Sequence, residues 1–288
     1  MKRKISIILF AALLTFSLFS CQKKTQIEGI SLDFSFSEEI LTDNLITYMH
    51  FKWKTDSNFV KMNKDFNVYV HFWHRENMLF QDDHIPEITT SKWEPNKEYT
   101  YTRRIYIPQF IDEFDPNFKG EEELKLSVGF FSPYDRSGKS QRRVLIKKIK
   151  VVPPPFDTPE VIYTDGWYES ESSADSFLKQ WNWTSKEARC IIDNPHRDAL
   201  LVIRGGVNLE ALDEQKIILR INGLIIDSFI PKDSIFEKSY EIKKEMLGEE
   251  EEFYLAIETD KTFKPAEIFP GSKDERELGV QISFIYFR

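Results

Sequence analysis

Cysteine is scarce in this sequence, whose 288 residues hold only Cys21 and Cys190. Two cysteines cannot build a disulfide framework, so stability has to come from buried apolar side chains and paired strands. Positive charge is also in deficit, with 39 Lys and Arg against 47 Asp and Glu. Because phosphate binding needs a net basic surface, we expect no nucleic-acid partner. Beyond the first 20 residues no apolar run approaches the roughly 20 residues that cross a bilayer.

Catalytic signatures are missing as well. The chain has no Gly-x-Ser-x-Gly elbow, no phosphate-cradling glycine loop and no two-histidine zinc motif, so we expect no catalytic residue, no metal and no cofactor. His71 and His74 are three apart on an expected strand, which directs them to opposite faces. The sequence 82–84, Asp-Asp-His, is typical of a solvated turn. A carboxylate pair for glycoside hydrolysis stays open, because its separation of about 5–10 Å depends on the fold.

The N-terminus has the layout of a secretory leader. Three positive charges in Met1–Lys4 precede an apolar stretch from Ile5 to Phe19, which predicts a signal peptide over 1–20. The tetrapeptide Leu18-Phe19-Ser20-Cys21 resembles the site at which bacterial lipoproteins are lipidated on the cysteine and cut before it. An uncleaved anchor helix, or a cut elsewhere, is the alternative.

Lipidation at Cys21 implies a location and a partner. The protein is then held to a membrane of the cell envelope through its N-terminal lipid, either facing the periplasm or exposed on the surface. Residues 21–27 form a polar tether. Removing 1–20 takes away three positive charges and no negative ones, so the formal charge changes from −8 to −11.

The chain after the tether is long enough for two domains. Residues 45–54 and 67–75 carry aromatic and β-branched side chains with a period near two, which is typical of strands. Further strands are expected at 28–36, 98–107, 123–131 and 142–151. Together they predict an antiparallel, immunoglobulin-like β-sandwich over 28–152. The proline-rich segment 153–160 cannot continue a sheet ladder and predicts a stiff linker.

A second, jelly-roll-like β-sandwich is predicted over 161–288, which makes the protein all-β. Its expected strands are 160–164, 188–192, 199–204, 215–221, 224–230, 238–244, 252–259 and 278–287. The dipeptide Asn222-Gly223 supplies the two positive φ angles of a tight hairpin. A short helix is expected within 171–180. Cys190, in an apolar stretch, is expected to be a small buried residue.

Aromatic side chains are the main candidates for ligand binding, because planar rings stack on sugar faces. Trp181 and Trp183 alternate around Asn182 and so share one face of an extended segment. Core packing and a ligand face both remain open for them. Trp93, in a loop, either covers the end of a sheet or touches a partner. The remaining candidates are Trp167 and the charged pair Asp274 and Arg276, which either fixes a loop as an ion pair or lines a polar ligand site.

Several sequence stretches resemble the extracytoplasmic β-sandwich domains of bacterial glycosyltransferase and mannosyltransferase type membrane proteins. In the second domain these are Gly166–Glu169, Trp181–Trp183, Leu219–Gly223, Phe263–Ala266 and Asp274–Val280; in the first, Val70–Phe72, Asp83–Pro86, Thr90–Pro95 and Tyr106–Pro108. The resemblance implies an accessory or carbohydrate-contacting module without the transferase. It supplies no binding residues.

Three functions are therefore open. The first is a non-catalytic lipoprotein that binds or organises a glycan. The second is a structural or assembly subunit that docks on another envelope protein through sheet edges and exposed aromatic side chains. The third is a hydrolase with an unrecognised carboxylate pair, which two facing acids in a concave cleft would support.

Overall fold

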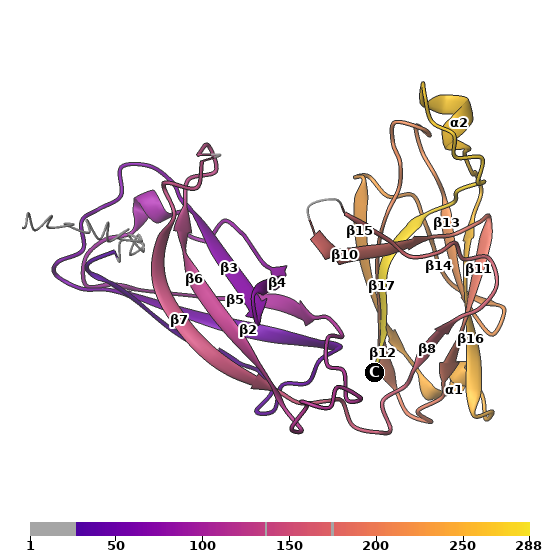
Figure 1. The fold of residues 1–288 in the computed structure, drawn as a ribbon, viewed down its shortest axis with the longest axis horizontal. Helices are drawn as coiled ribbons and strands as arrows, with labels where there is room; N and C mark the ends of the chain where they lie inside the picture. Colours follow the sequence, from indigo (N-terminus) through magenta and orange to yellow (C-terminus); the bar gives the residue numbers. More distant parts are fainter. Residues whose placement is uncertain (1–26, 136, 174–175) are drawn as a thin grey trace, which may run out of the picture.

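The computed structural model describes residues 27–135, 137–173 and 176–288 and shows an all-β protein built of two antiparallel β-sandwiches (Figure 1). This confirms the predicted fold class. The predicted signal peptide, the lipidation site Cys21 and nearly all of the tether lie outside the described residues. Within them, no helix is both long and apolar enough to cross a membrane.

The first sandwich packs a three-stranded sheet, in the order β1-β2-β5, against a four-stranded sheet in the order β4-β3-β6-β7. Its strands are β1 Ile30–Phe36, β2 Leu45–Thr55, β3 Asn67–His74, β4 Asn77–Gln81, β5 Glu98–Ile107, β6 Glu122–Phe131 and β7 Arg142–Val151, and a 3₁₀ turn, η1, spans Thr90–Lys92. Alternation along β2 shows how the core forms, because Met49, Phe51 and Trp53 are at most 1% exposed and lie in one cluster. The residues between them face outward.

The second sandwich packs two five-stranded sheets, in the orders β15-β12-β17-β10-β9 and β14-β13-β16-β11-β8. Its strands are β8 Val161–Tyr163, β9 Glu171–Ser173, β10 Ser176–Trp183, β11 Glu187–Asp193, β12 Ala199–Gly206, β13 Ile217–Ile221, β14 Leu224–Phe229, β15 Ile235–Ile242, β16 Glu252–Thr259 and β17 Gln281–Phe287; the short helices are α1 Lys244–Leu247 and α2 Pro265–Ile268. Cys190 is fully buried in this core, where burial raises the pKa of its thiol to about 12. The thiol is therefore un-ionised and inert near neutral pH.

The predicted hairpin at Asn222-Gly223 is present. Both residues have positive φ, 47° and 82°, and they join the paired strands β13 and β14.

Two other glycines allow close backbone approach. A Cβ at Gly166 would lie 1.9 Å from the carbonyl oxygen of Glu187, and one at Gly279 would lie 2.3 Å from that of Ser185.

The helix expected within 171–180 is wrong, because β9 and β10 occupy that region apart from 174–175, which are not described. β10 continues as far as Trp183 and pairs with β17, the C-terminal strand. Pairing with a strand about 100 residues away supplies backbone hydrogen bonds that the local sequence does not predict. β4, which follows β3 as a tight hairpin, was not expected either.

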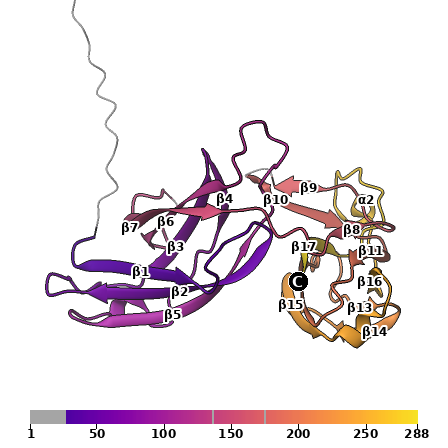
Figure 2. The same ribbon diagram turned by 90° about the horizontal axis from the view of Figure 1, so that it is seen from below.

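The two sandwiches lie side by side (Figure 2), and outward-facing residues from one sheet of each form a shared apolar cluster. Ile46 lies on the outward side of β2, yet it is buried, in a cluster with Val202 and Tyr286 from β12 and β17. Beside them Tyr106 stacks on Phe284 with ring centroids 4.2 Å apart. These outward positions are apolar because the neighbouring sandwich covers them.

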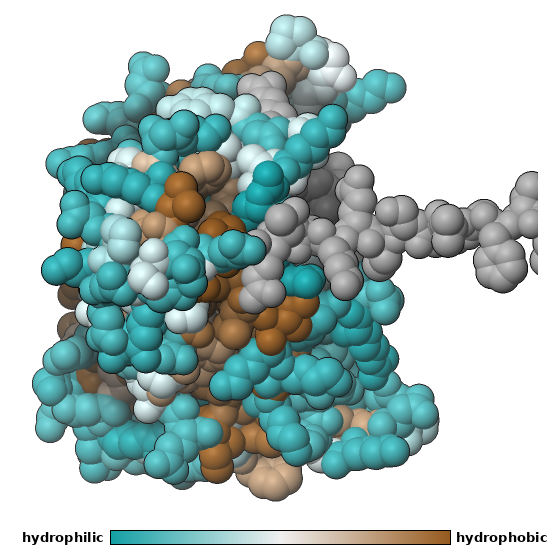
Figure 3. Space-filling view, turned by 90° about the vertical axis from the view of Figure 1, so that its left-hand side faces the viewer, coloured by the Kyte–Doolittle hydropathy of each residue, from teal (hydrophilic) through white to brown (hydrophobic). Residues whose placement is uncertain are grey.

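The strand β7 is the edge of the four-stranded sheet and carries the basic stretch 142–150. Lys148 and Lys150 pair with acids on or next to β6, with nitrogen to oxygen distances of 2.7 and 2.6 Å. Lys147 lies over the Phe34 ring of β1, 4.8 Å from its centroid. Charges on an edge strand discourage pairing with another chain. Figure 3 shows one end of the molecule, on the side of this sandwich, with apolar side chains in a band across a mostly hydrophilic surface.

Candidate functional site: a groove between the sandwiches

The structure excludes Trp93 from the candidate ligand-binding residues. Its side chain is fully buried beneath the loop that carries it. The ring stacks on Tyr99 at 4.6 Å, and the indole Nε1 donates to the carbonyl oxygen of Ile88 at 2.8 Å. Trp93 therefore closes one end of the first core, and the expectation that it contacts a ligand is wrong.

Trp167 and Trp183 are partly exposed, but each already has partners. The Trp167 ring stacks on Tyr163 at 4.3 Å, and its Nε1 donates to the carbonyl oxygen of Arg189 at 2.7 Å. The Trp183 ring meets the buried ring of Phe263 edge-on at 5.8 Å. Neither lines the groove described below.

Asp274 and Arg276 form a three-way ion-pair cluster with Glu171 of β9. The Arg276 Nη2 donates to both carboxylates at 2.7 Å, and the guanidinium lies over the Tyr168 ring. Its hydrogen bonds lower the pKa of Asp274. The arrangement ties the 264–279 loop to β9, which is the loop-fixing alternative raised for this pair.

A groove runs between the two sandwiches and encloses about 660 Å³. In Figures 1 and 2, β4 and β10 lie on the facing sides of the two sandwiches. We call this hollow the intersandwich groove, and its main lining residues are Met78, Phe80, Arg104, Trp181, Arg204 and Phe284. Gly206 also borders it and adds no side chain. A Cβ there would lie 3.1 Å from the Gln281 Oε1, so the glycine leaves room for that amide.

Trp181 is the predicted candidate that the groove contains. Its ring lines the wall, yet its Nε1 is enclosed and has no hydrogen-bond acceptor among the described residues. Buried indole N–H groups nearly always find a partner. The side chains of Gln180 and Gln281 line the same space and add amide donors and acceptors. An apolar wall with convergent polar groups is the usual form of a small-ligand site.

Asp82 brings a carboxylate to the groove, but the carboxylate is already paired. The Arg103 guanidinium donates to it at 2.8 and 2.9 Å, and the ring of His84 lies 3.1 Å away. Burial acts to raise the pKa of Asp82, but hydrogen bonds from His84 and Arg103 outweigh that effect and lower the pKa to about 2. A buried chain continues from His84 to the Tyr101 hydroxyl, which accepts from the Trp53 Nε1.

This network corrects the expectation of a solvated turn at 82–84. His84 is only 7% exposed, and Asp83 accepts from the backbone N–H of Val70 and contacts His71 at 3.2 Å. His74 pairs instead with Glu122, at 2.9 Å. The two histidines thus have separate carboxylate partners. Among the described residues, no cluster of three or more His, Cys, Asp or Glu side chains is arranged to hold a metal ion.

Two arginines and one glutamate flank the second-sandwich wall of the groove. Arg104 of β5 donates to the Ser239 Oγ at 2.8 Å and forms a short ion pair with Glu237 of β15. Arg204 of β12 lies 3.9 Å from the other oxygen of the same carboxylate and is about half exposed. One carboxylate thus serves two guanidinium groups.

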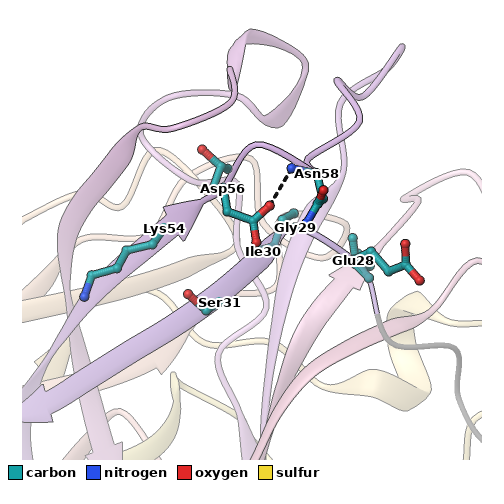
Figure 4. A pocket seen from close by; sticks show the side chains of 9 residues that line it. Glu28, Gly29, Ile30, Ser31, Lys54, Asp56 and Asn58 are labelled. Atoms are coloured by element: carbon teal, nitrogen blue, oxygen red, sulfur yellow. Dashed lines mark hydrogen bonds between the residues drawn. The ribbon is translucent and has the colours of Figure 1, made fainter.

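A second hollow, of about 720 Å³, lies where the described chain begins (Figure 4). Its polar groups are occupied locally, since Asp56 accepts from the backbone N–H of Asn58 at 2.6 Å and Lys54 pairs with Asp33 at 2.9 Å. We place the candidate site in the intersandwich groove, where the indole N–H of Trp181 has no acceptor among the described residues.

No protein-family model and no curated protein matches this chain. Among solved structures, it is similar to the secreted serine protease VesC from Vibrio cholerae, at 8% identity and a TM-score of 0.26, over 90% of this chain and 51% of that one. It is also similar to a beta-glucuronidase from Bacteroides uniformis, at 9% identity and a TM-score of 0.30, over 89% of this chain and 30% of that one.

A third similar structure is SGBP-B from a complex xyloglucan utilization locus in Bacteroides uniformis, at 8% identity and a TM-score of 0.26, over 88% of this chain and 98% of that one. The chain therefore spans about half of VesC and less than a third of the beta-glucuronidase. At these TM-scores the likenesses carry no argument about function.

Most of the groove was not among the residues singled out from the sequence. Phe80 belongs to β4, a strand that was not predicted from the sequence. Arg104, Arg204 and Gln281 occupy outward positions of strands with no distinctive sequence pattern. Outward positions with apolar or paired charged side chains are the one signal in the sequence that a covered face exists. That signal does not say which faces meet.

Proposed function

We propose that this protein is a lipid-anchored, exported, non-catalytic protein that binds a saccharide in the intersandwich groove. The predicted leader and Cys21 support the address, and the resemblance to accessory sandwich domains supports a carbohydrate-related role. The observation that carries the binding site is Trp181, a groove-lining aromatic ring whose indole N–H has no acceptor among the described residues. A sugar offers a flat apolar face to the ring and, when the ring turns to uncover the enclosed N–H, a hydroxyl oxygen to that group.

The charged groups of the groove favour binding over hydrolysis. Of the groove-lining residues described, Asp82 supplies the single carboxylate, whereas glycoside hydrolysis generally uses two. Asp82 is also held by Arg103 and His84, which leaves it poorly placed to give or take a proton. A general acid needs a raised pKa, and the pKa of Asp82 is lowered.

The test is binding of the detergent-extracted full chain to a glycan array, followed by calorimetry on each hit. Trp181→Phe keeps a ring and removes the N–H, so affinity should fall about tenfold, the scale of one hydrogen bond in an enclosed site. Trp181→Ala should abolish detectable binding. Trp167→Phe is the matched control, because it removes an indole N–H outside the groove. Binding that survives Trp181→Ala, or an array without hits, contradicts the proposal.

Docking on an envelope protein is the second candidate, and the edge strand β14 favours it. Leu224 and Ile225 on this strand are 61% and 57% exposed, and β14 has a strand partner on one side only. Such an edge can accept a strand from a partner. Crosslinking from position 224 to an envelope protein, together with loss of the crosslink in Ile225→Lys, would support docking. Glycan binding that is unaffected by Ile225→Lys would separate the two functions.

A further inference from the structure

The charges at the intersandwich groove do not balance. Asp82 is neutralised by Arg103, and Arg104 is neutralised by Glu237. Arg204 also lines the groove, and its nearest carboxylate oxygen, on Glu237, is 3.9 Å away, at the outer limit of an ion pair. Among the described residues, the groove therefore keeps one positive charge beyond its paired groups, in a chain whose formal charge is −8.

The surroundings of Arg204 suit an anionic group on a ligand. Its side chain is about half exposed, so packing leaves part of it accessible to a ligand. The neighbouring Trp181 and Phe284 give apolar walls, and Gly206, two residues along β12, leaves the adjacent outward position without a side chain. A guanidinium donates two parallel hydrogen bonds to a carboxylate or a sulfate, and partial enclosure strengthens the attraction.

We infer that the saccharide bound in the groove is anionic, carrying a uronate or sulfate group that pairs with Arg204. The inference rests on the proposed function and specifies the class of its ligand. Glu237 competes with that ligand, because it faces both Arg104 and Arg204. The groove therefore selects acidic sugars over neutral ones by the charge on Arg204, while Trp181 contributes to both.

Pairs of ligands that differ only in charge test this directly. The full chain in detergent is titrated with tetragalacturonate and with its fully methyl-esterified, neutral form, and then with a sulfated heparin tetrasaccharide and its desulfated form. In at least one pair the anionic member should bind about tenfold more tightly, the scale of a charge-assisted hydrogen bond. That advantage should shrink as salt is raised.

Two substitutions connect the preference to the groove. Arg204→Gln should abolish the preference for the anionic member, and Glu237→Gln should increase it several-fold by freeing the arginines. Arg197→Gln is the matched control, since it removes one exposed positive charge of the second sandwich away from the groove. A preference that persists in Arg204→Gln, or that Glu237→Gln lowers, overturns the inference.

The outcomes also separate the two levels of the proposal. Equal, Trp181-dependent binding of charged and neutral members overturns the anionic ligand class and leaves saccharide binding standing. Binding of neither member of any pair, together with an array without hits, overturns the proposed function itself.

Discussion

Trp93 and Trp181 place the same indole group in two contrasting regions of the molecule. In the first-sandwich core, the Trp93 ring is fully enclosed and its N–H has an acceptor, the carbonyl oxygen of Ile88. In the intersandwich groove, the Trp181 N–H has none among the described residues. The contrast is between an indole N–H that the fold itself satisfies and one for which we propose a ligand as the partner.

Removal of a core ring is expected to have the largest effect. Trp93→Ala deletes a ring that packs on Trp53, Tyr99 and Phe130. It should lower the free energy of unfolding by about 3–5 kcal/mol, since the cavity cannot close fully. Urea denaturation followed by circular dichroism measures the change. A loss below about 1 kcal/mol would mean that the ring is not part of a tight core.

Acid should weaken the buried network beside the groove by an intermediate amount. The folded pKa of Asp82, about 2, is below its ordinary value of 3.8, so its charge stabilises the fold above that value. The contribution, about 2 kcal/mol, is lost as the pH falls from 4 towards 2. Unfolding measured across this range should show a smaller loss in Asp82→Asn. Parallel curves for the two proteins would contradict this account of Asp82.

The contact between the sandwiches should be weaker than either core. Tyr106→Ala removes the ring stacked on Phe284. It should weaken the free energy of contact between the two sandwiches by about 1 kcal/mol. Faster protease cleavage within 153–160 and a larger radius of gyration in solution scattering would show the weakened contact. Tyr48→Ala, at an exposed position of β2, is the control. Identical cleavage of the two variants would show that Tyr106 does not hold the halves together.

The smallest effect is expected from removing the unsatisfied N–H. Trp181→Phe breaks no hydrogen bond within the described residues and should change the free energy of unfolding by no more than about 0.5 kcal/mol. Trp93→Phe leaves the carbonyl oxygen of Ile88 without its donor and should lower the free energy of unfolding by about 1–3 kcal/mol. Thermal unfolding of the pair sharpens the comparison. Equal losses would imply that the Trp181 N–H has a partner in the folded chain.

Strand periodicity was enough to predict most of the fold. Alternating aromatic and β-branched residues located β2, β3, β13 and β16 to within a few residues, and Asn222-Gly223 located a hairpin, because these signals arise from neighbours in the chain. β10 was not predicted as a strand, although Trp181 and Trp183 were placed on an extended segment; its ladder comes partly from β9 and partly from the distant β17. The sequence left open whether Trp93 covers the end of a sheet, since a loop residue enters a core only when the loop folds over that end.

The candidate site was predictable in part. Trp181 stood out as an aromatic residue on an extended segment, but the sequence did not favour it over Trp93 or Trp183. What distinguishes the three is whether each indole N–H or ring already has a partner. That distinction depends on residues far apart in the chain, such as Ile88 and Phe263.

By itself the sequence determined which residues of each strand face the core. Side chains that alternate in polarity must place one face inward wherever the chain is extended. Tertiary structure alone decided that the outward faces of β2, β5, β12 and β17 meet and leave a groove beside them. Contacts between outward faces depend on shape and on pairing between distant residues. No local pattern of side chains encodes them.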